Sequence, residues 1–372
     1  MSPASRVLVL NERDLEHPNS GGAEVHVTEI FERLATRGFE VTLASTSFPG
    51  SVDDSERGGI RIRRFGRIRH YYFRTGWHCA RETRRGRYDV VVDCMNKLPF
   101  QSPLYSAAPV LAIAHHLFGK SAFLEVSWPV ATTVYAMERM IPRIYRDVPF
   151  IAISESTRED LVARGIARDH IEVHHCGIRR PSFRPTVGNV RGVRIVYVGR
   201  LARYKQIDVL LRSAAKLVER FPELQVDIIG KGADGEYLAG VARDEGIGDR
   251  THFHGFVDDE ERDRLISTAR VSVCPSTKEG WGLTVIESNA LGTPVVATDA
   301  PGLRDSVEGD RTGFLVPDRD VDAFADRIGR LLADDALWRR MSDAALEWSK
   351  RFDWDVAAEK MGRSLEATRI VR

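Results

Sequence analysis

A chain of 372 residues is longer than a single hydrophobic core usually organises, so its length favours two domains. Its 43% of hydrophobic and 29% of charged residues are ordinary for a globular protein and argue against a disordered chain. The formal net charge of +1 gives no overall attraction to nucleic acid or to an anionic membrane, so either partner would need a local patch.

Strand-like apolar runs alternate with amphipathic helical segments in both halves, a pattern typical of parallel sheets covered by helices. In the first half the predicted strands span residues 6–11, 40–46, 60–65, 88–94, 109–116, 150–156 and 171–177. In the second half they span residues 193–200, 224–232, 251–256, 271–276, 294–300 and 313–318. We therefore predict two similar α/β domains.

The stretch 177–193 has two prolines, three glycines and no periodicity, which makes it the best candidate for a linker. We place the boundary near residue 185, giving an N-terminal domain of residues 1–185 and a C-terminal domain of residues 186–350. The last segment predicts two helices broken around residues 352–354. We expect the terminal helix, within residues 351–372, to pack back on the N-terminal domain.

Targeting and redox signals are weak in this sequence. Cys79, Cys94, Cys176 and Cys274 form no CxxC pair, so neither a zinc ribbon nor a disulfide framework is indicated. The apolar run 7–10 is too short for a signal peptide, and no stretch approaches the roughly 20 apolar residues of a membrane span. We expect a cytoplasmic protein.

Ligands of open parallel sheets bind beyond the carboxyl ends of the strands, where this chain places glycines and cations. Gly21 and Gly22 open a helix after the first strand, without the GxGxxG of a dinucleotide site. Arg200 and Lys205 precede a helix in the second half and suit a diphosphate, although a solvated surface explains them equally well. The strand ends of the second half also carry Gly199, Gly230, Gly232, Gly255 and Phe256.

The segment "EGWGLTVIE" sets Glu279 and Glu287 on either side of a predicted helix start at Leu283. A helix N-terminus carries free N–H groups and a partial positive charge, which suit a phosphate. The arrangement predicts an anion in the middle with a hydroxyl-bearing group on each side. A nucleotide sugar has this layout.

The motifs together resemble the retaining glycosyltransferases of family 4. The resemblance rests on "GRL" followed by Lys205, on "GKG", "HGFV" and "EGWGLTVIE", on "ALGTPVVATDAPGLRD", and on "GGAE" and "AISEST" in the first half. It covers nearly the whole chain, and the Glu-x7-Glu element is its most specific part. It implies the α/β GT-B fold, in which two Rossmann-like domains face each other across a cleft.

The resemblance also implies roles for individual residues. Glu279 would meet the hydroxyls of the donor sugar, and Glu287 those of the ribose. Arg200 and Lys205 would neutralise the leaving diphosphate, Gly21 and Gly22 would close on it from the other domain, and backbone near Gly255 and Phe256 would hold the base. The backbone N–H groups that would bind the diphosphate belong to Gly280, Trp281, Gly282, Leu283 and Thr284.

His115 ends a predicted strand and matches a histidine that family members place near the sugar and acceptor. His116 would lie on the opposite strand face, and the sequence does not decide which of the two faces the cleft. A lone histidine at a strand end is also commonly structural. The sequence departs from the family at Cys176–Arg179, where "CGIR" stands in place of a frequent Asn-Gly-x-Asp.

Two Asp-x-Asp pairs, within residues 318–322 and 353–355, match a metal-binding pattern of other glycosyltransferases. Both stand at predicted helix starts, where aspartate is a routine cap. The histidine pairs 174–175 and 252–254 lack nearby third ligands. We therefore expect no metal and no other cofactor.

Residues Arg61–Arg87 contain ten arginines and one acid, Glu82, among aromatic side chains. The segment is either a solvated helix face or a docking surface for an anionic acceptor or an acidic membrane, and Arg63, Arg64, Arg67 and Arg69 are candidates for that contact. No motif supports nucleic acid.

We expect a retaining, metal-independent enzyme that moves a hexose-type sugar from a UDP-sugar, or second from GDP-mannose, in cell-envelope or glycan biosynthesis. The acceptor would be lipid-linked or otherwise anionic, or a glycan, with the enzyme peripheral at the inner membrane face. The alternatives are a non-catalytic module that binds nucleotide sugars, an epimerase of sugar nucleotides, or a phosphorylase. The last lacks a cofactor-lysine signature.

Overall fold

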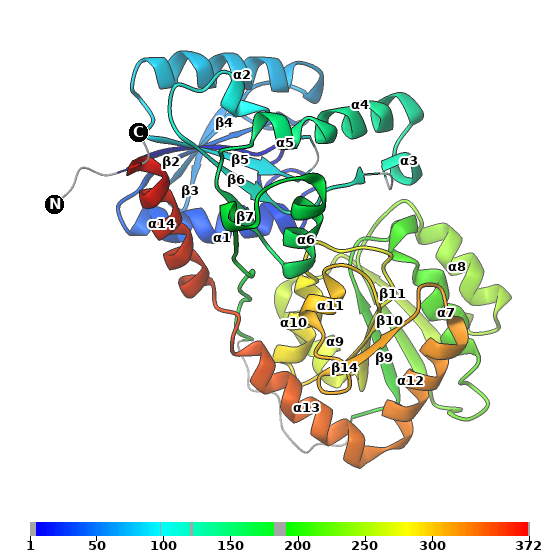
Figure 1. Ribbon diagram of the computed structural model, residues 1–372. Coiled ribbons are helices and arrows are strands. Elements are labelled where there is room, and N and C mark those ends of the chain that lie inside the picture. Colours follow the sequence, from blue (N-terminus) through cyan, green and yellow to red (C-terminus); the bar gives the residue numbers. More distant parts are fainter. Residues whose placement is uncertain (1–4, 97, 120–121, 182–190, 371–372) are drawn as a thin grey trace. The chain divides into compact units, whose positions relative to one another are not determined.

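The computed structural model describes residues 5–96, 98–119, 122–181 and 191–370, and it divides the chain into two compact units (Figure 1). The first unit comprises Met1–Gly177 and Asp353–Arg372, and the second comprises Ile178–Phe352. The boundary that we predicted near residue 185 lies outside the described residues. The first segment of the first unit ends at Gly177. The backbone of Gly177 packs against that of Trp354, which also belongs to the first unit, so closely that a Cβ at Gly177 would lie 2.3 Å from the Trp354 nitrogen.

The first unit contains an eight-stranded sheet in the order β3-β4-β2-β1-β5-β6-β7-β8. Its strands are β1 Arg6–Leu10, β2 Glu40–Ser45, β3 Asp54–Arg57, β4 Ile60–Arg64, β5 Val90–Met95, β6 Val110–Ala114, β7 Phe150–Ala152 and β8 Ile171–Val173. Six of the neighbouring pairs are parallel, and β3 pairs antiparallel with β4. Because β3 is a short polar edge strand, hydrophobic patterning did not reveal it. Its Glu56 faces Arg61 across the pair.

Helices cover both faces of this sheet. They are α1 Gly22–Thr36, α2 Ile68–Arg84, α3 Ala122–Glu125, α4 Trp128–Arg139, α5 Ile141–Ile144, α6 Glu155–Arg164 and α14 Trp354–Ile370. Figure 1 shows α1 and α2 on opposite faces, and α14 packs against α1. A Cβ at Gly362 of α14 would lie 3.2 Å from the Leu34 side chain of α1, so the missing side chain permits close approach. The terminal helix thus belongs to the first unit, although it follows the second in sequence.

The second unit contains a six-stranded, wholly parallel sheet in the order β11-β10-β9-β12-β13-β14. Its strands are β9 Arg194–Val198, β10 Gln225–Ile229, β11 Thr251–Gly255, β12 Val271–Cys274, β13 Val295–Thr298 and β14 Gly313–Val316. Its helices are α7 Ile207–Ala215, α8 Gly235–Asp244, α9 Asp259–Thr268, α10 Leu283–Ala290, α11 Leu303–Ser306, α12 Val321–Ala333 and α13 Asp335–Ser349. Most of these strands are continuous apolar runs because helices bury them on both faces, whereas the edge strand β11 exposes His252 and Phe253.

Both units are doubly wound Rossmann-like domains, as the alternation of strands and helices predicted. The break between α13 and α14 also falls where the sequence indicated it. Among the described residues, no helix combines the length and apolarity that a membrane span requires.

Candidate functional site

The loop between β12 and α10 carries the predicted Glu-x7-Glu element. Helix α10 begins at Leu283, as predicted, after Gly282 in a left-handed conformation with φ of +90°. Trp281 is buried and packs edge-to-face on Phe352, which fixes the loop before the helix. The Val285 N–H donates to the Gly282 carbonyl at 3.0 Å, so the N–H groups of Leu283 and Thr284 are the ones that the helix start offers to an anion.

Glycine is required where this loop meets the loop after β13. The Glu279 N–H donates to the Pro301 carbonyl at 3.2 Å, which brings the two loops together. Gly302 has φ of +79°, and a Cβ there would lie 2.3 Å from the Glu279 carbonyl oxygen. The "PGLRD" motif of the sequence therefore serves to hold the backbone of Glu279.

Glu279 and Lys205 form an ion pair. Lys205 ends a 3-10 turn, Arg203–Lys205, after β9, and Tyr204 of this turn accepts a hydrogen bond from the Thr277 N–H at 3.0 Å. The two side chains are 15% and 17% exposed, so water and a small ligand can reach them. Burial lowers the pKa of Lys205, but Glu279, with smaller contributions from Tyr204, Tyr197 and Cys274, raises that pKa above its ordinary value. The ammonium is therefore charged at any physiological pH.

The other predicted residues of the second unit lie along the carboxyl edge of the same sheet. Arg200 is exposed directly after β9, and Phe256 is exposed after β11. A Cβ at Gly230 would lie 1.9 Å from the Gly199 carbonyl, and one at Gly232 would lie 2.0 Å from the Leu201 carbonyl. Close packing of two protein loops requires glycine at both positions, and close approach by a ligand there stays a prediction.

Glu287 lies on α10, beside charged residues of α9. Its carboxylate is 3.7 Å from Arg262 Nη1. Burial raises the pKa of Glu287, and Arg262 acts against this rise. Sequence reasoning did not single out Arg262, because a charged residue near a helix start is usually a surface feature.

In the first unit, Gly21 caps α1 and its N–H donates to the Glu24 carboxylate at 2.7 Å. Asn96 donates to Asn11 at 2.9 Å and to the other Glu24 oxygen at 3.4 Å, so the strand ends β1 and β5 hold the turn. The N–H of Gly21 is already engaged, and Gly22 begins the helix. The remaining N–H groups of the first turn are the ones that an anion would meet.

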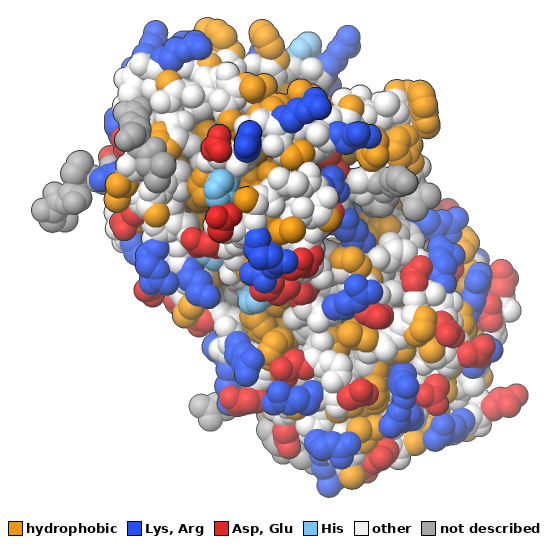
Figure 2. All heavy atoms as spheres, in the orientation of Figure 1, with side chains coloured by type: hydrophobic (Ala, Val, Ile, Leu, Met, Phe, Trp, Pro, Cys, Tyr) orange, Lys and Arg blue, Asp and Glu red, His pale blue; other side chains and the backbone are white. Residues whose placement is uncertain are grey.

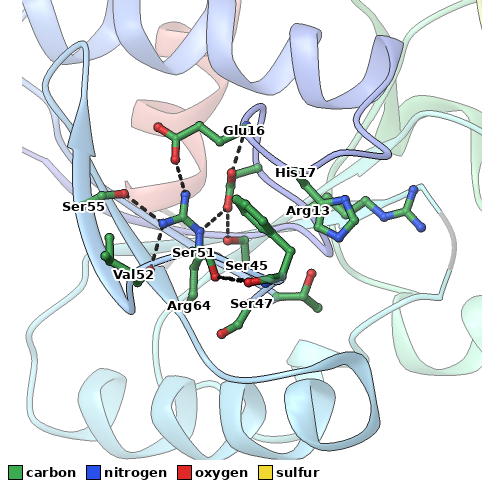
Figure 3. A network of polar contacts seen from close by, with 12 residues as sticks. Arg13, Glu16, His17, Ser45, Ser47, Ser51, Val52, Ser55 and Arg64 are labelled. Atoms are coloured by element: carbon green, nitrogen blue, oxygen red, sulfur yellow. Dashed lines mark hydrogen bonds and ion pairs between the residues drawn. The ribbon is translucent and has the colours of Figure 1, made fainter.

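The loop after β1 is anchored by a buried ion pair (Figure 3). Arg64 Nε lies 2.8 Å from the Asp14 carboxylate, and both side chains are 0% exposed. The same guanidinium lies 2.7 Å from Glu16, and Ser45 donates to Asp14 at 2.6 Å. Arg64 is therefore part of the interior, which corrects its assignment to an exposed basic surface. Its side chain alternates with Arg63 along β4 and points to the buried face.

His115 follows β6 and is buried. Its Nε2 lies 2.9 Å from Nδ1 of His26 on α1. Burial lowers the pKa of His115 to about 4, and burial together with His115 and His174 lowers that of His26. Both rings are therefore neutral at pH 7. His116 is half-buried and packs edge-to-face on Phe118. We did not predict this pair. The signal that could have revealed it is the position of His26 among the buried residues of α1.

The predicted capping aspartates act as caps. Asp320 accepts from the Ala323 N–H at 2.9 Å, and Asp353 accepts from the Asp355 N–H at 2.7 Å. His254 is hydrogen-bonded to Asp227 and His252 to Gln225, both at 2.7 Å. Within the described ranges, no group of three or more His, Cys, Asp or Glu side chains is arranged to hold a metal ion.

Two family models match the chain, one after the other. Residues 20–180 match "Glycosyltransferase Family 4", and residues 181–348 match "Glycosyl transferases group 1". Among curated relatives, a D-inositol 3-phosphate glycosyltransferase of Streptomyces avermitilis is 35% identical over 56% of this chain and 49% of its own length. The match thus spans about half of that relative. A protein of the same name from Xylanimonas cellulosilytica is 29% identical over 96% of this chain and 95% of its own.

Solved structures share the fold over nearly the full length. A sucrose-phosphate synthase from Thermosynechococcus elongatus superposes with a TM-score of 0.80 at 24% identity, covering 98% of both chains. Anabaena HepE in complex with UDP-glucose superposes with a TM-score of 0.75 at 17% identity, covering 97% of this chain and 99% of HepE. At such identities the likeness concerns the fold, whereas the two family models together account for residues 20–348. The chain belongs to glycosyltransferase family 4 and has the GT-B fold.

Proposed function

We propose that the protein is a retaining glycosyltransferase that uses a nucleoside diphosphate sugar without a metal ion. The observation that carries this proposal is the meeting of three groups at one sheet edge of the second unit. These are the N-terminus of α10, the Lys205 ammonium and the Glu279 carboxylate. A diphosphate needs the first two, and a sugar with free hydroxyls needs the third.

In this proposal, binding of the donor separates Lys205 from Glu279. The diphosphate takes over Lys205 and is also neutralised by Arg200, while Glu279 turns to the sugar hydroxyls. The bond from the anomeric carbon to the diphosphate oxygen breaks, and the acceptor oxygen forms the new bond on the same face. The acceptor proton passes to the departing diphosphate oxygen, so the step needs no protein nucleophile. Negative charge on the diphosphate is greatest at that point, where fixed cations stabilise it most.

His115 is our candidate for a contact near the sugar and acceptor. Its ring is neutral and one nitrogen is engaged by His26, so it would act through a single hydrogen bond. Gly21 and Gly22 are proposed as diphosphate contacts, and the Glu24 carboxylate holds their turn.

The donor that we propose first is a UDP-sugar, and GDP-mannose is the second. HepE was crystallised with UDP-glucose, which supports the first choice. The curated relatives are named for an inositol phosphate acceptor, which supports an anionic acceptor in our chain as well. A lipid-linked acceptor or a glycan would carry its charge on a phosphate or acidic sugar.

We further propose that the exposed face of α2 places the enzyme at an acidic membrane surface on the cytoplasmic side. Phe73 and Trp77 are 81% and 57% exposed one helical turn apart. Arg69 precedes Phe73 by about one turn, and Arg81 lies 4.5 Å from the centroid of the Trp77 ring. Orange and blue side chains gather along this edge of the molecule in Figure 2. Aromatic and basic groups side by side suit the boundary between acyl chains and anionic head groups.

Transfer assays on the purified protein test the proposal. A thermal-shift screen of UDP-, GDP- and ADP-sugars should find one donor class, since binding at 100 times Kd stabilises by about 2.7 kcal/mol. Sugar transfer with retention would then be followed by NMR of the product. Binding without transfer to any acceptor class would favour the non-catalytic module, and conversion of the free sugar nucleotide would favour the epimerase.

A further inference from the structure

Charged side chains at the start of α9 gather around Glu287 of α10. Arg262 Nη1 lies 3.7 Å from the Glu287 carboxylate and donates to Asp259 at 2.8 Å. Its Nε and Nη2 donate to one oxygen of Asp263 at 2.9 and 2.7 Å. The Arg262 side chain is 18% exposed, so these contacts fix its guanidinium plane against α10.

Acidic neighbours make Glu287 dependent on this cation. Burial raises the pKa of Glu287, and Asp263 and Asp259 raise it further. Arg262 acts in the opposite direction most strongly, and the more distant Arg179 adds to it. Without Arg262, the carboxylates of Asp259, Asp263 and Glu287 would repel one another with little positive charge nearby to offset the repulsion.

The departure from the family pattern at Cys176–Arg179 connects to the same corner. Arg179 Nη1 donates to Asp259 at 3.0 Å, on the carboxylate oxygen that Arg262 does not use. A basic residue where the family frequently has an aspartate thus becomes the outer member of a chain of alternating charges. This chain runs from Arg179 through Asp259 and Arg262 to Glu287.

We infer that Arg262 is a positioning residue that orients the Glu287 carboxylate toward the ribose hydroxyls of the donor, and so determines preference for ribonucleotides over deoxyribonucleotides. The inference rests on the proposed function, which assigns the ribose to Glu287. Arg262 acts through the Glu287 carboxylate and touches no reacting atom. The Arg262 guanidinium lies 3.7 Å from one oxygen of Glu287, and in this inference the other oxygen accepts from the ribose hydroxyls.

Arg264, on the same helix, is a matched control for the alternative that Arg262 only stabilises α9. Arg264 forms an ion pair with Glu261, and both side chains are exposed. If Arg262 served only to stabilise α9, replacing either arginine would have similar consequences. If Arg262 positions Glu287, only its replacement changes how the protein recognises the sugar of the nucleotide.

The test measures binding of UDP, 2′-deoxy-UDP, GDP and 2′-deoxy-GDP by calorimetry to the full chain. The variants are Arg262→Met, Arg262→Lys, Glu287→Gln, the double variant Arg262→Met/Glu287→Gln, and the control Arg264→Met. The wild type should prefer the ribonucleotide by about tenfold to a hundredfold, the value of one hydrogen bond to a charged group. Arg262→Met should reduce the preference to about twofold, Arg262→Lys should restore part of it, and Arg264→Met should retain it.

The double variant separates positioning from direct contact. If Arg262 acts through Glu287, the double variant should show the same preference as Glu287→Gln alone. An additional loss, or an unchanged preference in a folded Arg262→Met protein, overturns the inference. If Arg262→Met does not fold, Arg262→Lys replaces it in this test.

An assay of sugar transfer by the wild type distinguishes failure of this inference from failure of the proposed function. A wild type that transfers sugar but shows no ribose preference overturns the role of the Arg262–Glu287 pair and leaves the proposed function standing. A wild type that neither binds these nucleotides nor transfers sugar overturns both.

Discussion

Two ion pairs at strand-to-helix loops, one in each unit, differ in their access to solvent. Arg64 and Asp14 in the first unit are fully buried, and their remaining hydrogen-bonding groups are engaged by Glu16, Ser45 and nearby backbone (Figure 3). Lys205 and Glu279 in the second unit are partly exposed beside a helix N-terminus. The first pair can only hold a loop in place. The second can exchange partners with a charged ligand.

Breaking the buried pair should have the largest effect. Arg64→Met leaves Asp14 buried and unpaired, which should destabilise the first unit by about 3 to 5 kcal/mol. Hydrogen exchange of the β1 and β2 amides measures this for the first unit alone. Asp14→Asn in the same chain should recover part of the loss, and Arg69→Met on the exposed face of α2 should cost little. A loss below about 1 kcal/mol for Arg64→Met would mean that water reaches the pair.

Breaking the accessible pair should affect catalysis, with little change in stability. Lys205→Ala should lower kcat by about 10²- to 10³-fold, the usual value of one fixed group that stabilises transition-state charge, with a smaller change in donor affinity. Glu279→Ala should abolish transfer and leave nucleotide binding nearly intact. Lys216→Ala, which removes an exposed lysine paired with Asp322, is the control. An equal loss of donor affinity with unchanged kcat would contradict the role given to Lys205.

The histidine pair of the first unit is sealed like Arg64 and Asp14, but it is neutral. The pKa of His115 is lowered to about 4, while that of an unfolded histidine is about 6.5. The unfolded state therefore binds more protons between these values, and stability should fall by about 3 kcal/mol as the pH drops from 6.5 to 4. Unfolding of wild type and His115→Asn across this range measures the effect, with the partly exposed His170→Asn as control. Parallel pH profiles for all three proteins would show that His115 titrates normally.

Sequence patterning predicted the interior strands, the start of α10 and the break before α14, because burial on both faces and glycine at helix starts leave strong local signals. It did not predict β3, whose polar residues match no apolar alternation. Nor could it tell Arg64 from Arg63, since both stand in one basic run and only the pleat of β4 separates the buried side chain from the accessible one.

The residues of the candidate site also include some that local motifs predicted and some that they did not. Glu279, Lys205 and the α10 turn were named from motifs, and the structure brings them together. Arg262 and His26 were missed, because each acts through a partner that is distant in sequence. Gly230 and Gly232 were also named from a local signal, and each packs closely on a neighbouring loop, while their contact with the donor stays a prediction.

The exposed arginines of α2 sharpen the contrast between buried and accessible charge. Replacing Arg67, Arg69 and Arg74 with glutamine should weaken sedimentation with acidic liposomes by about 1 kcal/mol per residue at low salt. The acceptor KM should rise and donor binding should stay unchanged. Phe73→Ser/Trp77→Ser should weaken the same binding in a way that salt does not mimic, because the lost contact is apolar. If the wild type ignores acidic liposomes at low salt, the α2 face is only a solvated surface.

Chelation should have the smallest effect of all. In the proposed mechanism the charge on the leaving diphosphate meets Lys205, Arg200 and the N-terminus of α10, which together do the electrostatic work that a divalent ion performs in other glycosyltransferases. Activity in excess EDTA should therefore match that of the untreated enzyme. The Lys205→Ala variant makes the test sharper, since added magnesium or manganese should restore part of its turnover if the ammonium and a metal can occupy the same electrostatic role. Loss of wild-type activity in EDTA, regained with either ion, would show that the accessible ion pair does not suffice for the leaving group.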